Sequence, residues 1–227
     1  MGEQFFDEIV DSFFEEIGSG YRGAFERGQM FWTHVFYHKE NLQFWRPKNY
    51  DETKTYASEF VITSSTRDAF NRQTPLYTPK LEIDEEFVVV TAKRRPAILI
   101  SPVPEKVEIS EIRGGGKINI NLCLIAPLYS VEDIDGKAKY RMEFIDRIRK
   151  LEFPHLFFIP ENRMKGLRNS ICRLDRLQAF FANQMEAIDL KLSKDVLGVF
   201  KGQTEFFMTE RYADDYQVYR EILLESP

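Results

Sequence analysis

The stretch KRRPAILISP, residues 93–102, decides how this chain is expected to fold. Three cations precede Pro96, and the apolar run Ala97–Ile100 follows it. A short apolar run between turn residues is typical of a strand in a core. Pro96 removes an N–H and fixes φ, which stiffens the backbone next to Arg95. We therefore predict a strand over residues 95–101 that holds Arg95 at the rim of a sheet.

Outward from this strand, the apolar patterns predict a fold of the α+β class, mainly β with helices. Apolar and alternating runs predict strands, and helical spacing predicts helices near both chain ends. A basic turn at Lys93 is expected to join the central strand to the strand before it. The other predicted strands span 27–37, 59–66, 81–92, 103–112, 120–130, 156–161 and the start of 170–181; the predicted helices span 140–153, 192–208 with Ser193 as N-cap, and 211–224.

The first twenty residues form a distinct acidic segment. In EQFFDEIVDSFFEEIGSG the apolar residues recur at helical spacing, and all six charged residues of 1–20 are acidic. This pattern predicts an acidic amphipathic helix over 1–20, which either packs on the domain or forms a lid over a basic groove. The remainder, 21–227, is expected to be a single domain with a long insertion at about 38–80.

Composition and charge narrow the class of protein. The 227 residues are 43% hydrophobic with 20 Phe, which is typical of a globular domain. The net charge is −5, yet residues 93–176 carry 17 Lys and Arg against 11 Asp and Glu. The basic middle of the chain is therefore a candidate surface for anions.

Several classes of site and location are not expected. Cys123 and Cys172 stand in apolar contexts without a CxxC motif, so we predict buried, reduced thiols. The three histidines are too scattered to predict a metal site, and no cofactor motif is present. No apolar run reaches about 18 residues, and the acidic N-terminus is unlike a signal peptide. We expect a soluble, cytoplasmic protein with no membrane contact.

Arg95 is the first candidate for chemistry. An arginine fixed at a strand entry can bind phosphate with its planar guanidinium and stabilise charge in a phosphoryl transition state. The alternative is a pair of surface arginines that cap the strand and form ion pairs with Glu85 or Glu86.

A family resemblance favours the phosphate interpretation. RGQMFW, KRRPAILISP, INLCLIAPLYS, LRNSICRLDRLQAFF and LSKDVLGVFKGQTEFF occur in the order in which the MazF/PemK family of toxin ribonucleases carries its sequence blocks. The chain resembles that family over about half its length. The resemblance implies an SH3-like β-barrel with a C-terminal helix, a homodimer, and cleavage of single-stranded RNA without a metal.

The same resemblance assigns roles to individual residues. Arg95 matches the family arginine that acts on the scissile phosphate by electrostatics and as a proton donor. Tyr129 occupies the position of the family threonine by direct count, and Ser130 occupies it after a slip of one residue. Because such a slip moves a side chain to the other face of a strand, the two alternatives are distinct. Lys93, Arg94, Arg173 and Arg176 are the expected RNA-binding cations.

Two alternatives remain open at the level of function. Trp45 and Phe44 in the insertion could stack on RNA bases or could anchor a loop on the barrel. The barrel could also lack catalysis and act as a protein- or RNA-binding module, with an acidic peptide or an antitoxin-like protein as partner. A barrel with no nucleic-acid role is the third alternative.

Overall fold

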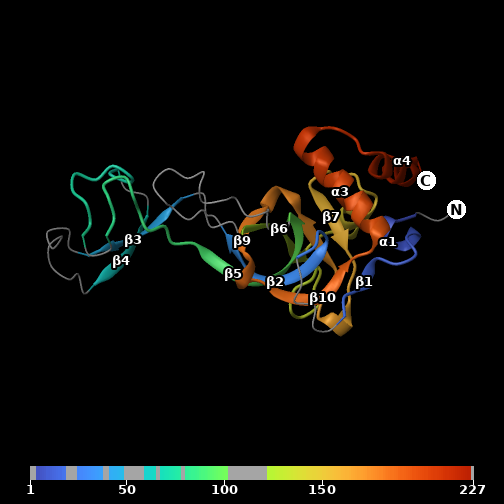
Figure 1. Ribbon diagram of the computed structural model, residues 1–227, viewed down its shortest axis with the longest axis horizontal. Coiled ribbons are helices and arrows are strands. Elements are labelled where there is room, and N and C mark those ends of the chain that lie inside the picture. The colour runs from blue at the N-terminus through green and yellow to red at the C-terminus, as the bar shows by residue number, and fades with distance from the viewer. Residues whose placement is uncertain are drawn as a thin grey trace, which may run out of the picture. The chain divides into compact units, whose positions relative to one another are not determined.

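The computed structural model describes residues 4–18, 25–37, 41–48, 59–64, 67–77, 80–101 and 122–225 (Figure 1). The chain divides into two compact units. The main unit comprises Met1–His34 and Arg94–Pro227, and the insert unit comprises Val35–Lys93. The insertion expected at about 38–80 falls inside the insert unit, and the strand expected at 103–112 lies outside the described residues.

The main unit is a mostly antiparallel sheet with a few helices, which confirms the α+β class. Its strand path is β1-β10-β2-β5-β6-β8-β7, and β9 also pairs with β6. Because β1 and β7 end this path, the sheet is not closed into a barrel within the described part of the chain. The strands are β1 (Phe14–Glu16), β2 (Gln29–Tyr37), β5 (Thr91–Ser101), β6 (Leu122–Ser130), β7 (Leu156–Ile159), β8 (Ser170–Arg173), β9 (Gln178–Phe181) and β10 (Glu186–Leu192).

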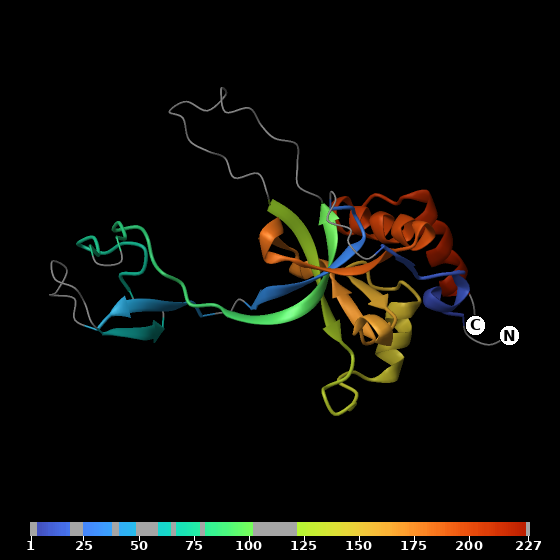
Figure 2. The same cartoon turned by 60° about the horizontal axis from the view of Figure 1, so that its bottom comes forward.

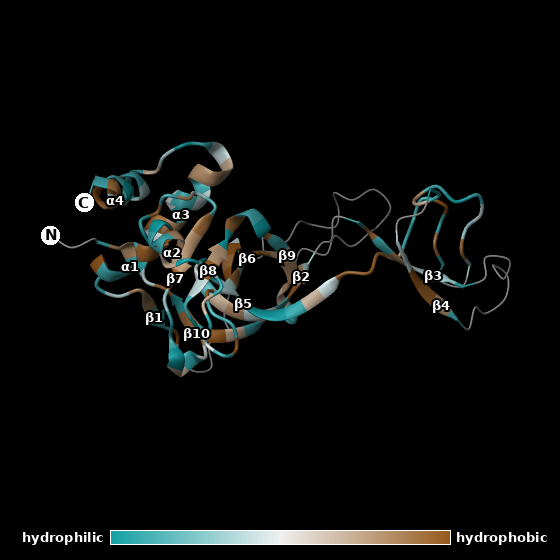
Figure 3. Ribbon diagram, turned by 180° about the vertical axis from the view of Figure 1, so that it is seen from behind, coloured by the Kyte–Doolittle hydropathy of each residue, from teal (hydrophilic) through white to brown (hydrophobic). Residues whose placement is uncertain are grey.

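The helices of the main unit are short, apart from two at the C-terminal end. These two pack beside each other, as the orange and red ribbons of Figure 2 show. Both combine apolar and polar segments, which is typical of helices with one buried side (Figure 3). The helices are α1 (Phe6–Ile9), α2 (Met142–Arg149), α3 (Lys194–Thr209) and α4 (Asp214–Glu225), with single 3-10 turns at Arg163–Lys165, Leu174–Arg176 and Ala182–Gln184.

The central strand β5 contributes to two apolar clusters. Ala97 and Leu99 join a small cluster with Ile125 of β6. Ile98 joins the larger cluster, which extends to Phe200 of α3. Successive side chains of a strand point to opposite faces, so the two clusters report the two faces of the sheet. This alternation also fixes the face on which each charged residue of β5 lies.

The predicted N-terminal helix over 1–20 is wrong. Only Phe6–Ile9 is helical, and Phe14–Glu16 forms β1, which pairs with β10 through the register Phe14↔Leu192. Phe6 and Phe13 are both buried in the larger cluster, where the Phe6 ring lies 5.7 Å from the Phe157 ring. The apolar spacing therefore reflects burial, and pairing with β10 satisfies the backbone in place of helical hydrogen bonds.

The predicted strand over 81–92, with its turn at Lys93, is also wrong. β5 begins at Thr91 and runs through Lys93 without a turn. Before it, the carbonyl oxygens of Leu81, Glu82 and Glu85 accept hydrogen bonds from the Arg72 guanidinium. A side chain takes up these three acceptors, and the segment pairs with β3 (Gln43–Pro47) only through the bridge Phe44↔Val88 and its flanking hydrogen bonds among the described residues.

Of the other described elements, the sequence patterns predict β2, β4 (Phe60–Ser64), β6, β7, β8, α2, α3 and α4 at about the observed positions, whereas β3, β9 and β10 were not predicted. α3 begins after Ser193, whose hydroxyl accepts a hydrogen bond from the Val196 N–H at 3.4 Å, as an N-cap does. Cys123 and Cys172 are buried and form no disulfide in the described part of the chain, and burial raises the pKa of the Cys172 thiol. No helix of the described residues is long and apolar enough to cross a membrane.

The insert unit contains β3 (Gln43–Pro47) and β4 (Phe60–Ser64), which pair as a two-stranded antiparallel sheet. Its buried interior includes charged side chains. The Arg46, Arg72 and Glu86 side chains are 1%, 2% and 0% exposed. Arg46 forms two hydrogen bonds to the Glu86 carboxylate, and Arg72 lies 2.8 Å from the same carboxylate. An ion network therefore occupies a position that a larger domain would fill with apolar residues.

Candidate nucleic-acid interface

Arg95 and Tyr129 lie together on one face of the main sheet. β5 and β6 are antiparallel with the register Ala97↔Pro127, and two further residues along each strand place Arg95 opposite Tyr129. The guanidinium carbon of Arg95 lies 4.6 Å from the centroid of the Tyr129 ring. Both side chains are half-buried. Of the two hydroxyl candidates, Tyr129 and Ser130, it is therefore Tyr129 whose ring contacts Arg95.

Arg173 reaches the same aromatic ring from the next strand. β8 pairs with β6 through Tyr129↔Ile171, and Arg173 is two residues beyond Ile171 on the same face. Its guanidinium carbon lies 5.9 Å from the Tyr129 centroid. Three neighbouring strands therefore bring two cations to one tyrosine. Stacking on an aromatic face restrains the orientation of a guanidinium and leaves its positive charge in place.

Asp175 sets the charge of this group. It accepts a hydrogen bond from the Arg173 Nε at 2.6 Å and a second from its terminal nitrogen. The hydrogen bond lowers the pKa of Asp175 and raises that of Arg173, so both side chains are ionised at neutral pH. Arg176 lies at the edge, with its Nε 4.0 Å from Asp175 and its side chain 54% exposed. We call Arg95, Tyr129, Arg173 and Asp175 the Tyr129 cluster.

The structure does not place Ser130 in this cluster. It follows Tyr129 on β6 and so points to the other face. Its hydroxyl donates to the Glu132 carbonyl at 2.6 Å and accepts from the Glu132 N–H at 3.3 Å. These two bonds close a local turn after β6, which is a common structural use of a serine hydroxyl.

Arg94 and Lys93 are separated from Arg95 as well. Arg94 points to the face opposite Arg95, where it lies 4.6 Å from the Trp32 ring and 2.6 Å from a Glu186 carboxylate oxygen. Lys93 is exposed and belongs to the insert unit. The expected ion pairs to Glu86 are not formed by the basic triplet, since Glu86 pairs with Arg46 and Arg72.

The aromatic candidates of the insert unit already have partners. Phe44 is buried, and its ring centroid lies 5.6 Å from that of Phe70 within the insert unit. Trp45 is 40% exposed, and its ring stacks on Phe60 with centroids 4.0 Å apart. One face of the Trp45 ring is therefore used within the insert unit.

The N-terminal acids contact a different arginine from those of the cluster. Asp7 accepts hydrogen bonds from Arg149 of α2 at 2.8 and 2.9 Å, and Glu8 accepts one at 2.6 Å. Burial lowers the pKa of Arg149, and the two carboxylates outweigh that effect, so its pKa is raised. The segment packs on the domain, as one of the two sequence alternatives proposed.

Sequence reasoning did not assign Asp175 to the site. Its signal was the Arg-Leu-Asp spacing of 173–175, in which a turn directly after a strand returns the carboxylate to the arginine. No cluster of three His, Cys, Asp or Glu side chains suited to a metal ion occurs among the described residues.

No family model, curated protein or solved structure matches this chain. Its function must therefore be argued from the site and not from the fold. The site is a cationic and aromatic group on one sheet face, with arginines fixed by stacking. Such a surface suits a ligand that offers both phosphates and bases.

Proposed function

We propose that the protein is a metal-independent endoribonuclease that cuts single-stranded RNA at the Tyr129 cluster. The observation that carries this proposal is the placement of two guanidinium groups, from β5 and β8, around the ring of Tyr129. Arginine binds phosphate oxygens through paired N–H donors, and a tyrosine phenol adds a further donor. The resemblance to the MazF/PemK family supplies the reaction class.

In the proposed reaction the ribose 2′-hydroxyl gives its proton to water, and its oxygen attacks the adjacent phosphorus. The P–O5′ bond breaks, a 2′,3′-cyclic phosphate forms, and the leaving 5′-oxygen takes a proton from Arg95, which water then restores. Negative charge builds on the phosphoryl oxygens in the transition state, and fixed cations stabilise that charge more than they stabilise the substrate. Arg95 would hold these oxygens, with the Tyr129 phenol as hydrogen-bond donor. Arg173 and Arg176 would bind neighbouring phosphates along the strand.

A cleavage assay tests the proposal directly. A mixed-sequence single-stranded RNA should be cut by the purified protein with and without EDTA. Arg95→Ala should lower the cleavage rate by about a hundredfold or more, because removal of one electrostatic donor from a transition state has an effect of that order. Arg163→Gln is the matched control, since Arg163 is 84% exposed and pairs only with Glu161 among the described residues. Intact RNA at high protein concentration would contradict the nuclease.

Two further variants separate the hydroxyl candidates. Tyr129→Phe keeps the ring on which the arginines stack and removes the phenol oxygen, so RNA binding should persist while cleavage falls about tenfold or more. Ser130→Ala should leave cleavage unchanged, because the Ser130 hydroxyl closes a turn on the other face. A large loss of cleavage in Ser130→Ala alone would return the catalytic role to Ser130.

The resemblance extends the proposal to the biological setting. An SH3-like barrel, a homodimer and a cytoplasmic toxin held by an antitoxin protein are the arrangement it implies. Expression without a partner should arrest bacterial growth, and Arg95→Ala should relieve the arrest. Light scattering after size exclusion would measure the oligomeric state.

One observation favours a second function, an RNA- or protein-binding module without catalysis. Asp175 neutralises Arg173, and a phenol stands where the family has a smaller hydroxyl side chain. Saturable binding of RNA, with no cleavage in any buffer, would support this second function over the first.

A further inference from the structure

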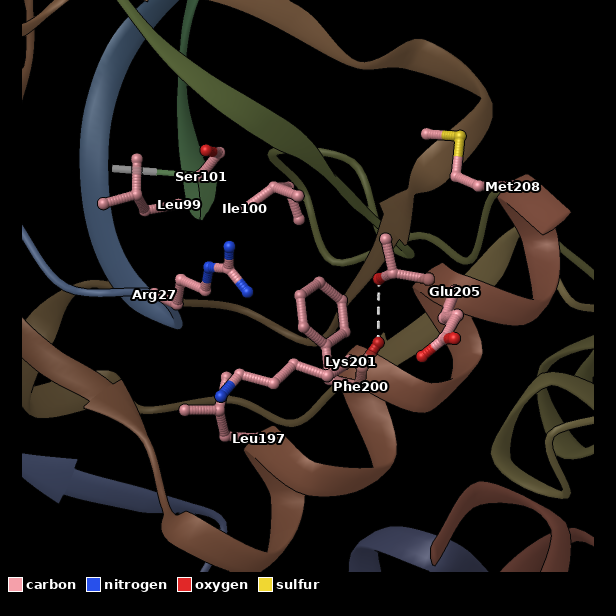
Figure 4. A pocket seen from close by; sticks show the side chains of 10 residues that line it. Arg27, Leu99, Ile100, Ser101, Leu197, Phe200, Lys201, Glu205 and Met208 are labelled. Atoms are coloured by element: carbon pink, nitrogen blue, oxygen red, sulfur yellow. Dashed lines mark hydrogen bonds between the residues drawn. The ribbon is translucent and has the colours of Figure 1, made fainter. Parts of the chain in front are cut away.

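A separate pocket of about 330 Å³ lies between β5, the start of β2 and α3, and shares no residue with the Tyr129 cluster (Figure 4). Leu99, Ile100, Leu197, Phe200 and Met208 form its apolar lining. Arg27, Lys201 and Glu205 supply its charged groups, and Ser101 and Thr204 its hydroxyl groups. Its volume falls at the lower end of the range for small-molecule sites.

The backbone at Gly28 places Arg27 at this pocket. Gly28 has φ +80, and a Cβ there would lie 2.9 Å from the Leu197 Cδ1. Its N–H donates to the Leu99 carbonyl at 2.9 Å, which ties the start of β2 to β5. Only glycine allows both this conformation and this approach to α3. Figure 4 shows the Arg27 guanidinium directed from this turn toward the Phe200 ring.

The two cations of the pocket lack anionic partners. Within the described part of the chain, neither Arg27 nor Lys201 takes part in an ion pair or side-chain hydrogen bond. Lys191, by contrast, is paired, because its Nζ lies 3.4 Å from both a Glu15 and a Glu26 carboxylate oxygen. The Thr204 hydroxyl is occupied by the Phe200 carbonyl at 2.8 Å. An apolar cavity with two unpaired cations at its rim is complementary to an anion with an apolar tail.

We propose that this pocket binds a small organic acid, with its carboxylate between Arg27 and Lys201 and its hydrocarbon tail against Leu197, Phe200 and Met208. The carboxylate supplies the charge that the two cations lack, and a single-headed ligand uses the apolar wall that an inorganic anion would leave empty. Glu205 disfavours ligands with a second negative group at the Met208 end.

Octanoate is the probe, and the full chain is the protein. Methyl NMR should show saturable shifts of the Met208 and Leu197 methyl signals, with a Kd on the order of 0.1–1 mM for a ligand of roughly ten non-hydrogen atoms. Arg27→Gln and Lys201→Gln should each weaken binding about fivefold to tenfold. Glu205→Gln should tighten it by about twofold, since a like charge is removed.

Controls distinguish the pocket from general adsorption. Lys194→Gln removes a cation from the first turn of the same helix, outside the pocket, and should leave the octanoate Kd unchanged. Octanol should bind at least fivefold more weakly than octanoate. Equal binding of octanol, a Kd unchanged in both Arg27→Gln and Lys201→Gln, or no saturable shift up to about 10 mM octanoate would each overturn the proposal.

Discussion

Tyr129 is the residue that Arg95 and Arg173 both contact on the main sheet. Its ring brings Arg95 and Arg173 together although they come from strands that do not pair with each other. Each cation–π contact at a partly exposed site contributes about 0.5–1 kcal/mol, enough to restrain a long side chain without neutralising it. The tyrosine ring therefore restrains both arginines, and in the proposed reaction its phenol would also donate a hydrogen bond. A threonine at this position would supply the hydroxyl alone.

Replacing Asp175 should change the affinity for RNA, and the direction of that change distinguishes two roles for its carboxylate. It lies where an RNA phosphate would approach Arg173, and Asp175→Asn removes one negative charge from the site. Binding of single-stranded RNA should strengthen about threefold to tenfold, and the salt dependence of log K should steepen by about one charge. Fluorescence anisotropy at several salt concentrations measures both quantities.

Glu225→Gln is the matched control, because Glu225 is exposed at the end of α4 and its loss should leave RNA affinity almost unchanged. Weaker RNA binding by a folded Asp175→Asn variant would show instead that Asp175 orients Arg173 for the phosphate.

The lowered pKa of Asp175 also makes the stability of the folded protein depend on pH. Its contribution is present above the unfolded-state pKa and is lost as pH falls through the lower folded-state pKa, by less than about 1 kcal/mol at this exposure.

At the scale of elements, strands and helices were predictable where local pattern and tertiary burial agree. The apolar run Ala97–Ile100 becomes β5, and Ser193 caps α3, because the features that form these elements lie within a few residues. The failures have tertiary causes. Phe14–Glu16 pairs with a strand more than 170 residues later, and Arg72 takes carbonyl groups that a strand over 81–92 would use. No local pattern reports such distant partners.

The packing of α3 against α4 permits a prediction with two glycines of one helix. A Cβ at Gly202 would lie 2.7 Å from the Tyr216 Cβ and 3.1 Å from the Ala213 Cβ, both close to the α4 backbone. A Cβ at Gly198 would lie 3.0 Å from an Asp215 carboxylate oxygen, the end of a side chain that can rotate away. Alanine gains about 1 kcal/mol over glycine inside a helix.

Gly202→Ala should therefore lower the free energy of unfolding by about 1–3 kcal/mol, because α4 must shift to relieve the overlap. Gly198→Ala should leave it unchanged or raise it by up to about 1 kcal/mol. Urea unfolding followed by circular dichroism compares the two variants. Equal destabilisation by both substitutions would show that the close contact of Gly202 with α4 does not determine the change in the free energy of unfolding.

At the scale of the whole molecule, the chain stabilises its two units by different means. The main unit buries a large apolar cluster that extends from the N-terminal segment to α4. The insert unit buries the charged side chains of Arg46, Arg72 and Glu86 beside a few apolar residues such as Phe44 and Leu76. The sequence allowed an insertion to be predicted but not this network, since its members stand 14 to 40 residues apart with no periodic pattern. Arg95 and Tyr129 were named from the family resemblance, whereas their contact depends on the register between β5 and β6, which no local pattern predicts.

The ion network predicts a stability defect confined to one unit. Glu86→Gln removes the carboxylate shared by Arg46 and Arg72 and leaves two nearly inaccessible guanidinium groups without it, which should destabilise the insert unit by about 3–5 kcal/mol. Hydrogen exchange by mass spectrometry should then show lost protection in peptides from 41–48 and 80–90, with protection retained in 122–200.

Glu82→Gln is the control for this prediction. It changes an exposed carboxylate and keeps the backbone carbonyl that accepts a hydrogen bond from Arg72, so protection should persist in both units. Loss of protection in 122–200 by Glu86→Gln would contradict the assignment of this network to the insert unit alone.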